Sequence, residues 1–391
     1  MSRPTFEVAD IVQQQGNRFI ERHRKWLSYQ QLNVLRAIGR CRTSALGGHL
    51  DACPRCGHQA ISYNSCRNRH CPKCQAQARQ RWLTAREQEL LDVSYFHVVL
   101  TLPHQLNPLV RQNAALLYNL LFAASAKTLL EVAADPKHLG AEIGFFSILH
   151  TWGQNLMLHP HLHCVIPFGG LSADHQSWVR PHYPFFLPVK VLSRVFRGKF
   201  VAGLKRAYRR KLLQLSGELQ DLARPKRFAA FLRTLFREDW VVYAKPSFGG
   251  AETVLRYLGR YTHRVAISNH RLLDFNGDSV TFRWKDYAHG NKQRKMTLTA
   301  MEFLRRFVQH VLPLGFVRIR YFGFLANRLR THLLRLCRQL HGSAPLNMLS
   351  PQSAIQTTAT WLCPRCGSMM VISARLTAQQ LALRLAAIDT S

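Results

Sequence analysis

The chain has 391 residues, of which 54 are Lys or Arg and only 21 are Asp or Glu, so its formal net charge is +33 at pH 7. With 47% hydrophobic residues it can bury a core, and its length suits two or three domains. A charge of this size resists compaction unless a polyanion screens it, so we expect nucleic acid as the partner. The basic residues are spread along the chain, which argues against a disordered arm. A basic protein of the ribosomal or membrane-surface type is the alternative.

The cysteines indicate metal binding in a reducing compartment. Ten are present, most of them in or beside Cys-x-x-Cys pairs. We find no apolar leader with a cleavage site and no run of about 18 apolar residues. We therefore expect a cytoplasmic protein with no membrane partner, whose reduced thiols bind metal instead of forming disulfides.

Hydrophobic periodicity predicts an α+β protein. The expected elements are, in chain order, helices at 6–26, around 32–38 and at 75–91, a strand at 94–103, a helix at 107–134, strands at 143–152 and 161–167, basic helices at 190–238, a strand at 240–244, a helix at 253–263, a hairpin at 271–284 and helices at 301–311 and 323–340. The expected domains are a helical region at 1–48, a zinc-binding domain at 49–92, a catalytic domain at 93–300 that contains the basic helices, C-terminal basic helices at 301–341, and a linker with a Cys-x-x-Cys tail at 342–391.

The segment 49–74 concentrates the residue types that bind zinc. They are Cys53, Cys56, Cys66, His70, Cys71 and Cys74, with His49 and His58 nearby. The two Cys-x-x-Cys pairs can close one tetrahedral zinc. The remaining Cys66 and His70 either belong to a second zinc or replace one pair, and the spacing does not decide between these arrangements.

A further Cys-x-x-Cys, formed by Cys363 and Cys366, resembles half of a zinc ribbon. A possible second zinc there needs Cys337, His341 or another segment to complete it. The basic residues of the first cysteine segment are either phosphate contacts or solvated charges; we expect DNA contacts from Arg67, Arg69 and Lys73.

Two histidines, His161 and His163, flank one apolar residue in a predicted strand, so both side chains point to the same face. Two buried unpaired imidazoles would be costly, whereas together they can hold a divalent metal. For the third ligand, the predicted hairpin places Gln154 almost opposite His161, and His150 is an alternative on the same face. His159 is the least suitable. This donor set, with open positions, suits a catalytic Mg²⁺ or Mn²⁺ bound to a phosphate.

Tyr257 and Tyr261 are four residues apart, which places them on one face of a helix. On spacing alone they are half-buried tyrosines that pack on a sheet. Arg256, Arg260 and Arg264 accompany them, however, and a phosphotyrosine intermediate needs a phenolic nucleophile, a metal and cations around the developing charge. We therefore expect catalytic tyrosines, with the three arginines in contact with DNA.

Taken together, these residues resemble the HUH superfamily of rolling-circle nucleases. His161-Leu162-His163 matches its histidine–apolar–histidine signature, the strand at 96–102 is similar to its first strand motif, and the tyrosines match its two-tyrosine branch. With the cysteine segment at 63–74, the chain is similar to transposases of the insertion sequence ninety-one family, which carry an N-terminal transposase zinc-binding domain.

The resemblance implies a ferredoxin-like antiparallel sheet with the metal on its central strands and the tyrosine helix packed over it. It implies cleavage of single-stranded DNA at the ends of a transposon and transfer to a target through a 5′-phosphotyrosine, by a rolling-circle-like route. Zinc would be structural. The chain contains no GxxxxGK[ST] loop, so strand unwinding is expected from a host helicase and the host replication machinery.

Three other functions remain open from the sequence. A plasmid replication initiator or relaxase would use the same chemistry at an origin. A non-catalytic, zinc-dependent DNA-binding protein would bind without cleaving. A metal-dependent phosphoesterase would use water in place of tyrosine.

Overall fold

A computed structural model describes residues 4–87, 89–181, 187–245, 259, 266–286, 289–342 and 361–389. The chain forms two compact units, each discontinuous in sequence. The cysteine-rich unit comprises Met1–Gln77, Ile267–Val311 and Leu346–Ser391. The sheet unit comprises Ala78–Ala266 and Leu312–Pro345.

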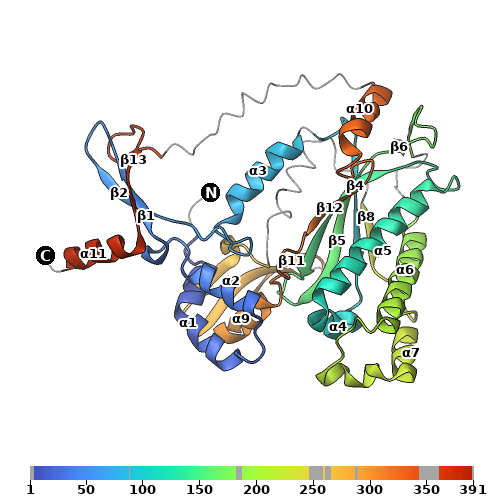
Figure 1. Cartoon of the computed structure of the whole chain (residues 1–391), viewed down its shortest axis with the longest axis horizontal. Helices are drawn as coiled ribbons and strands as arrows, with labels where there is room; N and C mark the ends of the chain where they lie inside the picture. The colour runs from blue at the N-terminus through green and yellow to red at the C-terminus, as the bar shows by residue number, and fades with distance from the viewer. Residues whose placement is uncertain are drawn as a thin grey trace. The chain divides into compact units, whose positions relative to one another are not determined.

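The sheet unit is built on a five-stranded sheet in the order β12-β4-β5-β3-β8 (Figure 1). Every neighbouring pair is antiparallel. The strands are β3 (Tyr95–Thr101), β4 (Gly144–Trp152), β5 (Leu158–Pro167), β8 (Val242–Lys245) and β12 (Ile319–Gly323). All nine residues of β4 are buried, because both faces of the sheet are covered.

Helices cover one face of this sheet and enclose its main core. They are α4 (Asn107–Gln112), α5 (Ala114–Ala134), α6 (Val189–Arg209) and α7 (Pro225–Thr234). Val98 of β3 and Leu162 of β5 pack there with Leu121 of α5 and Phe200 of α6. In chain order, β3, α5, β4, β5, α6 and β8 give a strand–helix–strand–strand–helix–strand sequence, with β5 and β3 inside the sheet.

Residues of the opposite sheet face pack with α10 (Arg330–His341), for example Ile148 with Leu334 and Cys337. This unit also contains the short pair β6 (Gly170–Leu171) and β7 (Trp178–Val179), together with two 3-10 turns at His104–Leu106 and Gly217–Ala223. Helix α3 (Gln75–Glu87) joins the two units in sequence.

Helix α5 is long and apolar enough to cross a membrane by composition, with a mean hydropathy of 1.3 over 18 residues. Its residues Leu117, Leu121 and Leu129 are nevertheless fully buried in the core of the sheet unit. The helix therefore acts as a core helix in this fold.

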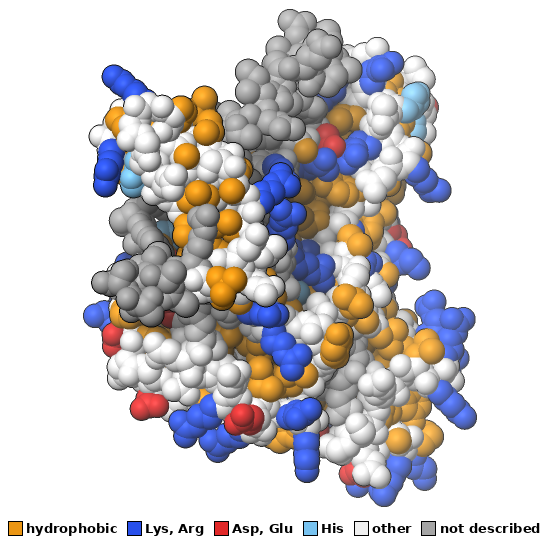
Figure 2. All heavy atoms as spheres, turned by 60° about the vertical axis from the view of Figure 1, so that its left-hand side comes forward, with side chains coloured by type: hydrophobic (Ala, Val, Ile, Leu, Met, Phe, Trp, Pro, Cys, Tyr) orange, Lys and Arg blue, Asp and Glu red, His pale blue; other side chains and the backbone are white. Residues whose placement is uncertain are grey.

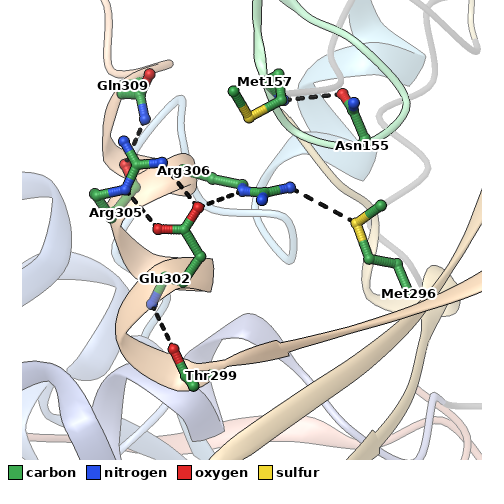
Figure 3. Close-up of polar contacts among 8 residues, drawn as sticks. All are labelled: Asn155, Met157, Met296, Thr299, Glu302, Arg305, Arg306 and Gln309. Atoms are coloured by element: carbon green, nitrogen blue, oxygen red, sulfur yellow. Dashed lines mark hydrogen bonds and ion pairs between the residues drawn. The ribbon is translucent and has the colours of Figure 1, made fainter.

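In the cysteine-rich unit, α1 (Val8–His23) and α2 (Tyr29–Gly39) form a helical pair, and α9 (Ala300–Val308) follows a three-stranded sheet in the order β11-β10-β9. The strands of that sheet are β9 (Leu272–Phe275), β10 (Ser279–Asp286) and β11 (Lys292–Thr299). The Thr299 hydroxyl caps α9 by accepting from the Glu302 amide at 3.2 Å. Glu302 also binds Arg305 and Arg306 of the next turn (Figure 3).

The same unit contains a second sheet in the order β13-β1-β2, made of β1 (Gly48–Ala52), β2 (Gln59–Tyr63) and β13 (Val371–Leu376). Figure 1 shows the red C-terminal strand β13 beside the blue N-terminal strand β1. Helix α11 (Ala378–Asp389) follows β13, and 3-10 turns occur at Ser44–Leu46 and Asn269–Arg271. Segments more than 300 residues apart thus complete one small sheet.

The α+β class and the four strands predicted around 94–103, 143–152, 161–167 and 240–244 are confirmed. The helix predicted at 107–134 is interrupted at Asn113, whose extended φ of −124° breaks the helical backbone. The helix predicted at 323–340 begins only at Arg330, because Ile319–Gly323 pairs with β4 as an edge strand. Most of the predicted tyrosine helix at 253–263 lies outside the described residues.

Candidate functional site

The candidate active site is a histidine cluster on two adjacent strands of the sheet unit. The β4–β5 register places His150 directly opposite His161, and His163 follows two residues along β5 on the same face. One ring nitrogen from each of the three histidines lies within 4.8 Å of the others. We refer to His150, His161 and His163 as the histidine cluster.

Hydrogen bonds orient the imidazoles so that two ring nitrogens face each other. His161 Nδ1 donates to the carbonyl oxygen of His159 at 2.6 Å, so a neutral His161 has its lone pair on Nε2. His163 Nδ1 lies 2.8 Å from His97 Nε2. The two Nε2 atoms of His161 and His163 are 3.1 Å apart. Two nitrogen ligands at right angles, each roughly 2.1 Å from one metal, would be separated by about 3 Å, so the pair fits a shared ion.

Two of the three histidines favour the neutral form. Burial, together with the neighbouring imidazole of His159, lowers the pKa of His161 to about 3. Burial, together with the imidazoles of His150 and His161, lowers the pKa of His163 well below its usual value. Neutral imidazole is the form that coordinates metal, and removal from water disfavours the charged form.

The predicted position of Gln154 is wrong. Pairing continues from His150 and His161 to Trp152 and Leu158, with a register shift between them, so residues 153–157 form the turn. Gln154 therefore lies in that turn and not opposite His161. The turn is closed by the amide of Gly153 and the carbonyl of Met157, 2.9 Å apart. His150, the alternative, occupies the position facing His161.

His97 is a functional candidate that the sequence reading missed. It lies on β3, the other neighbour of β5, and is only 4% exposed. Its ring is nearly parallel to that of His163, with 4° between the planes. Its Nε2 forms a hydrogen bond with Nδ1 of His163, the nitrogen that faces away from His161. A histidine within the apolar strand run at 94–103 was the available signal.

The predicted nucleophiles Tyr257 and Tyr261, and Arg256, Arg260 and Arg264, lie outside the described residues. Gly259, midway between the tyrosines, is described, and it is helical and buried. A Cβ atom at Gly259 would meet the side chain of Leu83 on α3 at 2.9 Å. A larger residue at this position would therefore require the end of the Leu83 side chain to move.

Two groups of four cysteines lie in the cysteine-rich unit. The first, which we call the proximal sulfur cluster, consists of Cys41, Cys66, Cys71 and Cys74. Three of its sulfur pairs, Cys41–Cys74, Cys66–Cys74 and Cys41–Cys71, are 3.6–3.7 Å apart. The amide of Cys66 donates to Cys41 Sγ at 3.4 Å. Four sulfurs around a zinc at about 2.3 Å would be separated by about 3.8 Å, so this spacing fits a tetrahedral site.

The second group, the distal sulfur cluster, consists of Cys53, Cys56, Cys363 and Cys366. Cys53 and Cys366 are 3.5 Å apart at sulfur, and Cys56 and Cys363 are 3.6 Å apart. The two halves come from segments 313 residues apart in sequence, measured from Cys53 to Cys366. The missing half of the Cys363 and Cys366 motif is therefore the first N-terminal Cys-x-x-Cys.

The predicted pairing of the two N-terminal Cys-x-x-Cys motifs in one site does not occur. Cys53 and Cys56 lie in the turn between β1 and β2, where Ala52 pairs with Gln59, whereas Cys71 and Cys74 follow the other end of that hairpin. His70 is not part of either cluster; its Nδ1 is 3.2 Å from the Asn68 side-chain oxygen.

The alternative in which Cys66 joins Cys71 and Cys74 is confirmed, but Cys41 takes the place expected of His70. Cys41 was missed because it belongs to no Cys-x-x-Cys motif and lies 25 residues before Cys66. Hydrogen bonds with the thiols of Cys66 and Cys71 lower the pKa of Cys41 to about 7. The lowered pKa of Cys41 favours the thiolate, which is the form that binds zinc.

Cys337, suggested as a partner for the C-terminal motif, is instead buried in the core of the sheet unit.

The basic residues near the proximal sulfur cluster differ in their surroundings. Lys73 forms an ion pair with Glu7, and burial lowers the pKa of Arg69. Arg67 is exposed, with a positive φ of 51°. Blue Lys and Arg side chains are scattered over the face drawn in Figure 2, with few red Asp or Glu side chains among them. Arg67 is therefore the most accessible of the three candidates for DNA contact.

The histidine cluster and the proximal sulfur cluster each lie in a segment that matches a known family. Residues 144–332, which include the histidine cluster, match a family model described as "Putative transposase". Residues 11–102, which include the proximal sulfur cluster, match a model described as "Transposase zinc-binding domain". The chain is 33% identical over 361 residues to the "Transposase for insertion sequence element IS801" of Pseudomonas savastanoi pv. phaseolicola, covering 86% of this chain and 82% of that protein.

The chain belongs to the IS91 family of transposases. A second relative in this family, "Putative transposase y4qJ" of Sinorhizobium fredii, is 54% identical over 342 residues, covering 88% of this chain and 86% of the relative. No solved structure is significantly similar to the chain. As the sequence predicted, this IS91-family transposase has an N-terminal zinc-binding domain.

Proposed function

We propose that this transposase cuts single-stranded DNA at transposon ends, retains the 5′ end as a phosphotyrosine and transfers it to a target strand by a rolling-circle-like route. The observation that carries the proposal is the histidine cluster on the inner strands β4 and β5. The strand–helix–strand–strand–helix–strand order and the sheet order β4-β5-β3-β8 are those of a ferredoxin-like sheet, which supports the HUH assignment. The protein would act in the cytoplasm, with unwinding supplied by a host helicase and the replication machinery.

His150, His161 and His163 would hold a divalent cation, which supplies polarisation of the scissile phosphate. Mg²⁺ prefers oxygen ligands and imidazole suits softer metals, so three imidazoles favour Mn²⁺ over Mg²⁺. His97 and the carbonyl of His159 orient two of the rings through their other nitrogens, the usual arrangement around metal-binding histidines.

Tyr257 and Tyr261 would supply the nucleophiles. The phenolic oxygen forms a bond to phosphorus, the bond from phosphorus to the 3′ oxygen breaks, and the leaving strand takes up a proton as its 3′-hydroxyl. The ester conserves the bond energy, so a later 3′-hydroxyl can reverse the step and join DNA. Arg256, Arg260 and Arg264 would bind the phosphates that flank this position.

Zinc would be structural in both sulfur clusters. All eight cysteines of the clusters are free of disulfides, and four sulfur ligands are the donor set of a closed structural zinc site. The distal sulfur cluster would fasten the C-terminal segment to the β1–β2 hairpin. The proximal sulfur cluster would fix the segment that leads into α3.

The test is a denaturing gel of the full chain with labelled single-stranded oligonucleotides from transposon ends and added Mn²⁺. We expect a labelled band at the mass of the protein that requires metal, persists in Tyr257→Phe or Tyr261→Phe alone and is lost in the double variant. Tyr63→Phe, the same change at a tyrosine of β2 in the cysteine-rich unit, is the control and should keep the band.

Each of the other functions predicts a different gel. Cleavage without a protein-linked band would indicate a hydrolytic phosphoesterase. Binding with neither cleavage nor adduct would indicate a DNA-binding protein. Adducts on an origin sequence, and none on transposon ends, would indicate a replication initiator or relaxase.

A further inference from the structure

The connection between α1 and α2 exposes two large aromatic side chains. Trp26 is 80% exposed and Tyr29 is 77% exposed. By contrast, Phe19 of α1 and Leu35 of α2 are at most 1% exposed. Two nearly bare aromatic rings in an otherwise well-packed helical pair contribute little to its core, so their use lies outside it.

The backbone that carries these rings is well ordered by local hydrogen bonds. The Trp26 amide donates to the carbonyl of His23 at 2.9 Å. A reciprocal cap then starts α2, in which Ser28 Oγ accepts from the Gln31 amide and Gln31 Oε1 accepts from the Ser28 amide. Tyr29 is thereby fixed in the first turn of α2.

The ring of Trp26 also lies beside other rings of the helical pair. Its centroid lies 5.7 Å from that of His23, and His23 lies 4.7 Å from the buried ring of Phe19. This series of rings links an exposed indole to the core of the helical pair. A ring held in this way loses little conformational entropy when a flat ligand stacks on it.

The same connection carries three exposed cations, Arg22, Arg24 and Lys25. Among the residues that the structure describes, none of the ion pairs involves these three side chains. Glu21 is the one acidic residue in this stretch, so the cations outnumber it three to one. A net positive charge beside exposed aromatic rings suits an anion with flat apolar faces.

We propose that Trp26 and Tyr29, with Arg22, Arg24 and Lys25, form a stacking platform for unpaired bases of single-stranded DNA. Bases stack on the two rings while the cations bind the adjoining phosphates, as in other surfaces that hold single strands. A duplex fits less well, because its base faces are already stacked on each other. This inference rests on the proposed function only in taking DNA as the polyanion. The platform lies in the unit that contains the sulfur clusters.

The test measures equilibrium binding of the full chain to a single-stranded oligonucleotide that contains 2-aminopurine, with no divalent metal added. Stacking quenches this base. We expect Trp26→Ala with Tyr29→Ala to lower affinity at least about 10-fold and to remove the quenching, given roughly 1–3 kcal/mol per stacked base. The pair Trp26→Phe with Tyr29→Phe keeps flat rings and should bind within about 3-fold of the unaltered protein. Leu314→Ala, at an 84% exposed apolar position, should have no effect.

Two further arms separate the sources of binding. Replacing Arg24 and Lys25 with Gln should reduce the slope of log affinity against log salt by about 1.4, since each phosphate contact on a single strand contributes about 0.7. In the double alanine variant, affinity for a duplex of the same sequence should change less than about 2-fold. The melting temperature of the variant protein should equal that of the unaltered protein.

An unchanged affinity or retained quenching in the double alanine variant would overturn the platform, as would an equal loss on duplex. Self-association of the unaltered chain that the double variant abolishes, with DNA binding intact, would assign the surface to a protein partner instead. Adduct formation at saturating oligonucleotide should survive in the double variant. Failure of the adduct assay in the unaltered protein would therefore count against the proposed chemistry and leave the platform result standing.

Discussion

Replacing His97 with Phe tests whether this buried imidazole positions the metal ligand His163. Phe keeps the ring volume but removes the nitrogen that lies 2.8 Å from His163 Nδ1. Both residues are buried, at 4% and 8% exposure, so water cannot easily replace the lost partner. Leaving a buried hydrogen-bonding group unsatisfied costs roughly 1–3 kcal/mol.

Part of that cost should appear in metal binding. Loss of the partner that orients a ligating histidine typically reduces metal affinity 10–100-fold, which corresponds to about 1.4–2.7 kcal/mol. We therefore expect the Mn²⁺ concentration for half-maximal adduct formation to rise by that factor in His97→Phe. The maximal yield at saturating Mn²⁺ should recover, because the ligands themselves remain.

The assay is a Mn²⁺ titration of adduct formation at fixed protein and oligonucleotide. His97→Gln, whose amide oxygen can accept from His163, should fall between the unaltered protein and His97→Phe. His104→Phe, the same change at an exposed histidine, is the control and should leave the titration unchanged. An unaltered half-maximal concentration in His97→Phe, with the same melting temperature as the unaltered protein, would refute the positioning role.

Two further predictions concern the metal content and the sheet. Elemental mass spectrometry of the purified protein should find two zinc ions per chain. Cys41→Ser and Cys363→Ser should each reduce this number to one, because each change removes a ligand from one sulfur cluster. A single zinc in the unaltered protein would contradict two closed sites. Gly323→Ala should lower the free energy of unfolding by about 3 kcal/mol or prevent folding, because Gly323 has a φ of +58° and a Cβ there would lie 1.7 Å from the carbonyl oxygen of Ile143. Gly315→Ala, with a φ of +69° and no neighbour within 4 Å, should cost only about 1 kcal/mol in the same urea titration, and equal losses would refute the steric reason.

The histidine pair could be found from the sequence because its information is local. Alternation along one strand suffices to place His161 and His163 on one face, and the structure bears this out. The third ligand was harder to predict, because the residue opposite His161 depends on the length of the turn between β4 and β5. The actual turn places His150 there and leaves Gln154 in the turn. His97 depended on the order of strands, since only the pairing of β3 with β5 brings it to His163.

The grouping of the cysteines shows the opposite case. Spacing favours one zinc site made of the two nearest Cys-x-x-Cys motifs. The β1–β2 hairpin separates them, because Cys53 and Cys56 lie in its turn and Cys71 and Cys74 follow its open end. The actual partners are a lone cysteine, Cys41, and a motif far along the chain at Cys363. The local sequence pattern shows neither partner, because the pairing of β1 with β2 and β13 brings the distal cysteines together and none of these three strands was predicted.

The distal sulfur cluster also has a consequence for biosynthesis. A ribosome adds about 5–20 residues per second, so the 313 residues between Cys53 and Cys366 take roughly 15–60 s to make. During that interval β1 lacks its neighbour β13, and Cys53 and Cys56 lack half of their partners. A nascent or prematurely terminated polypeptide would therefore expose an open strand edge and two unsatisfied thiols, which marks it for chaperones and proteases before it can act on a genome.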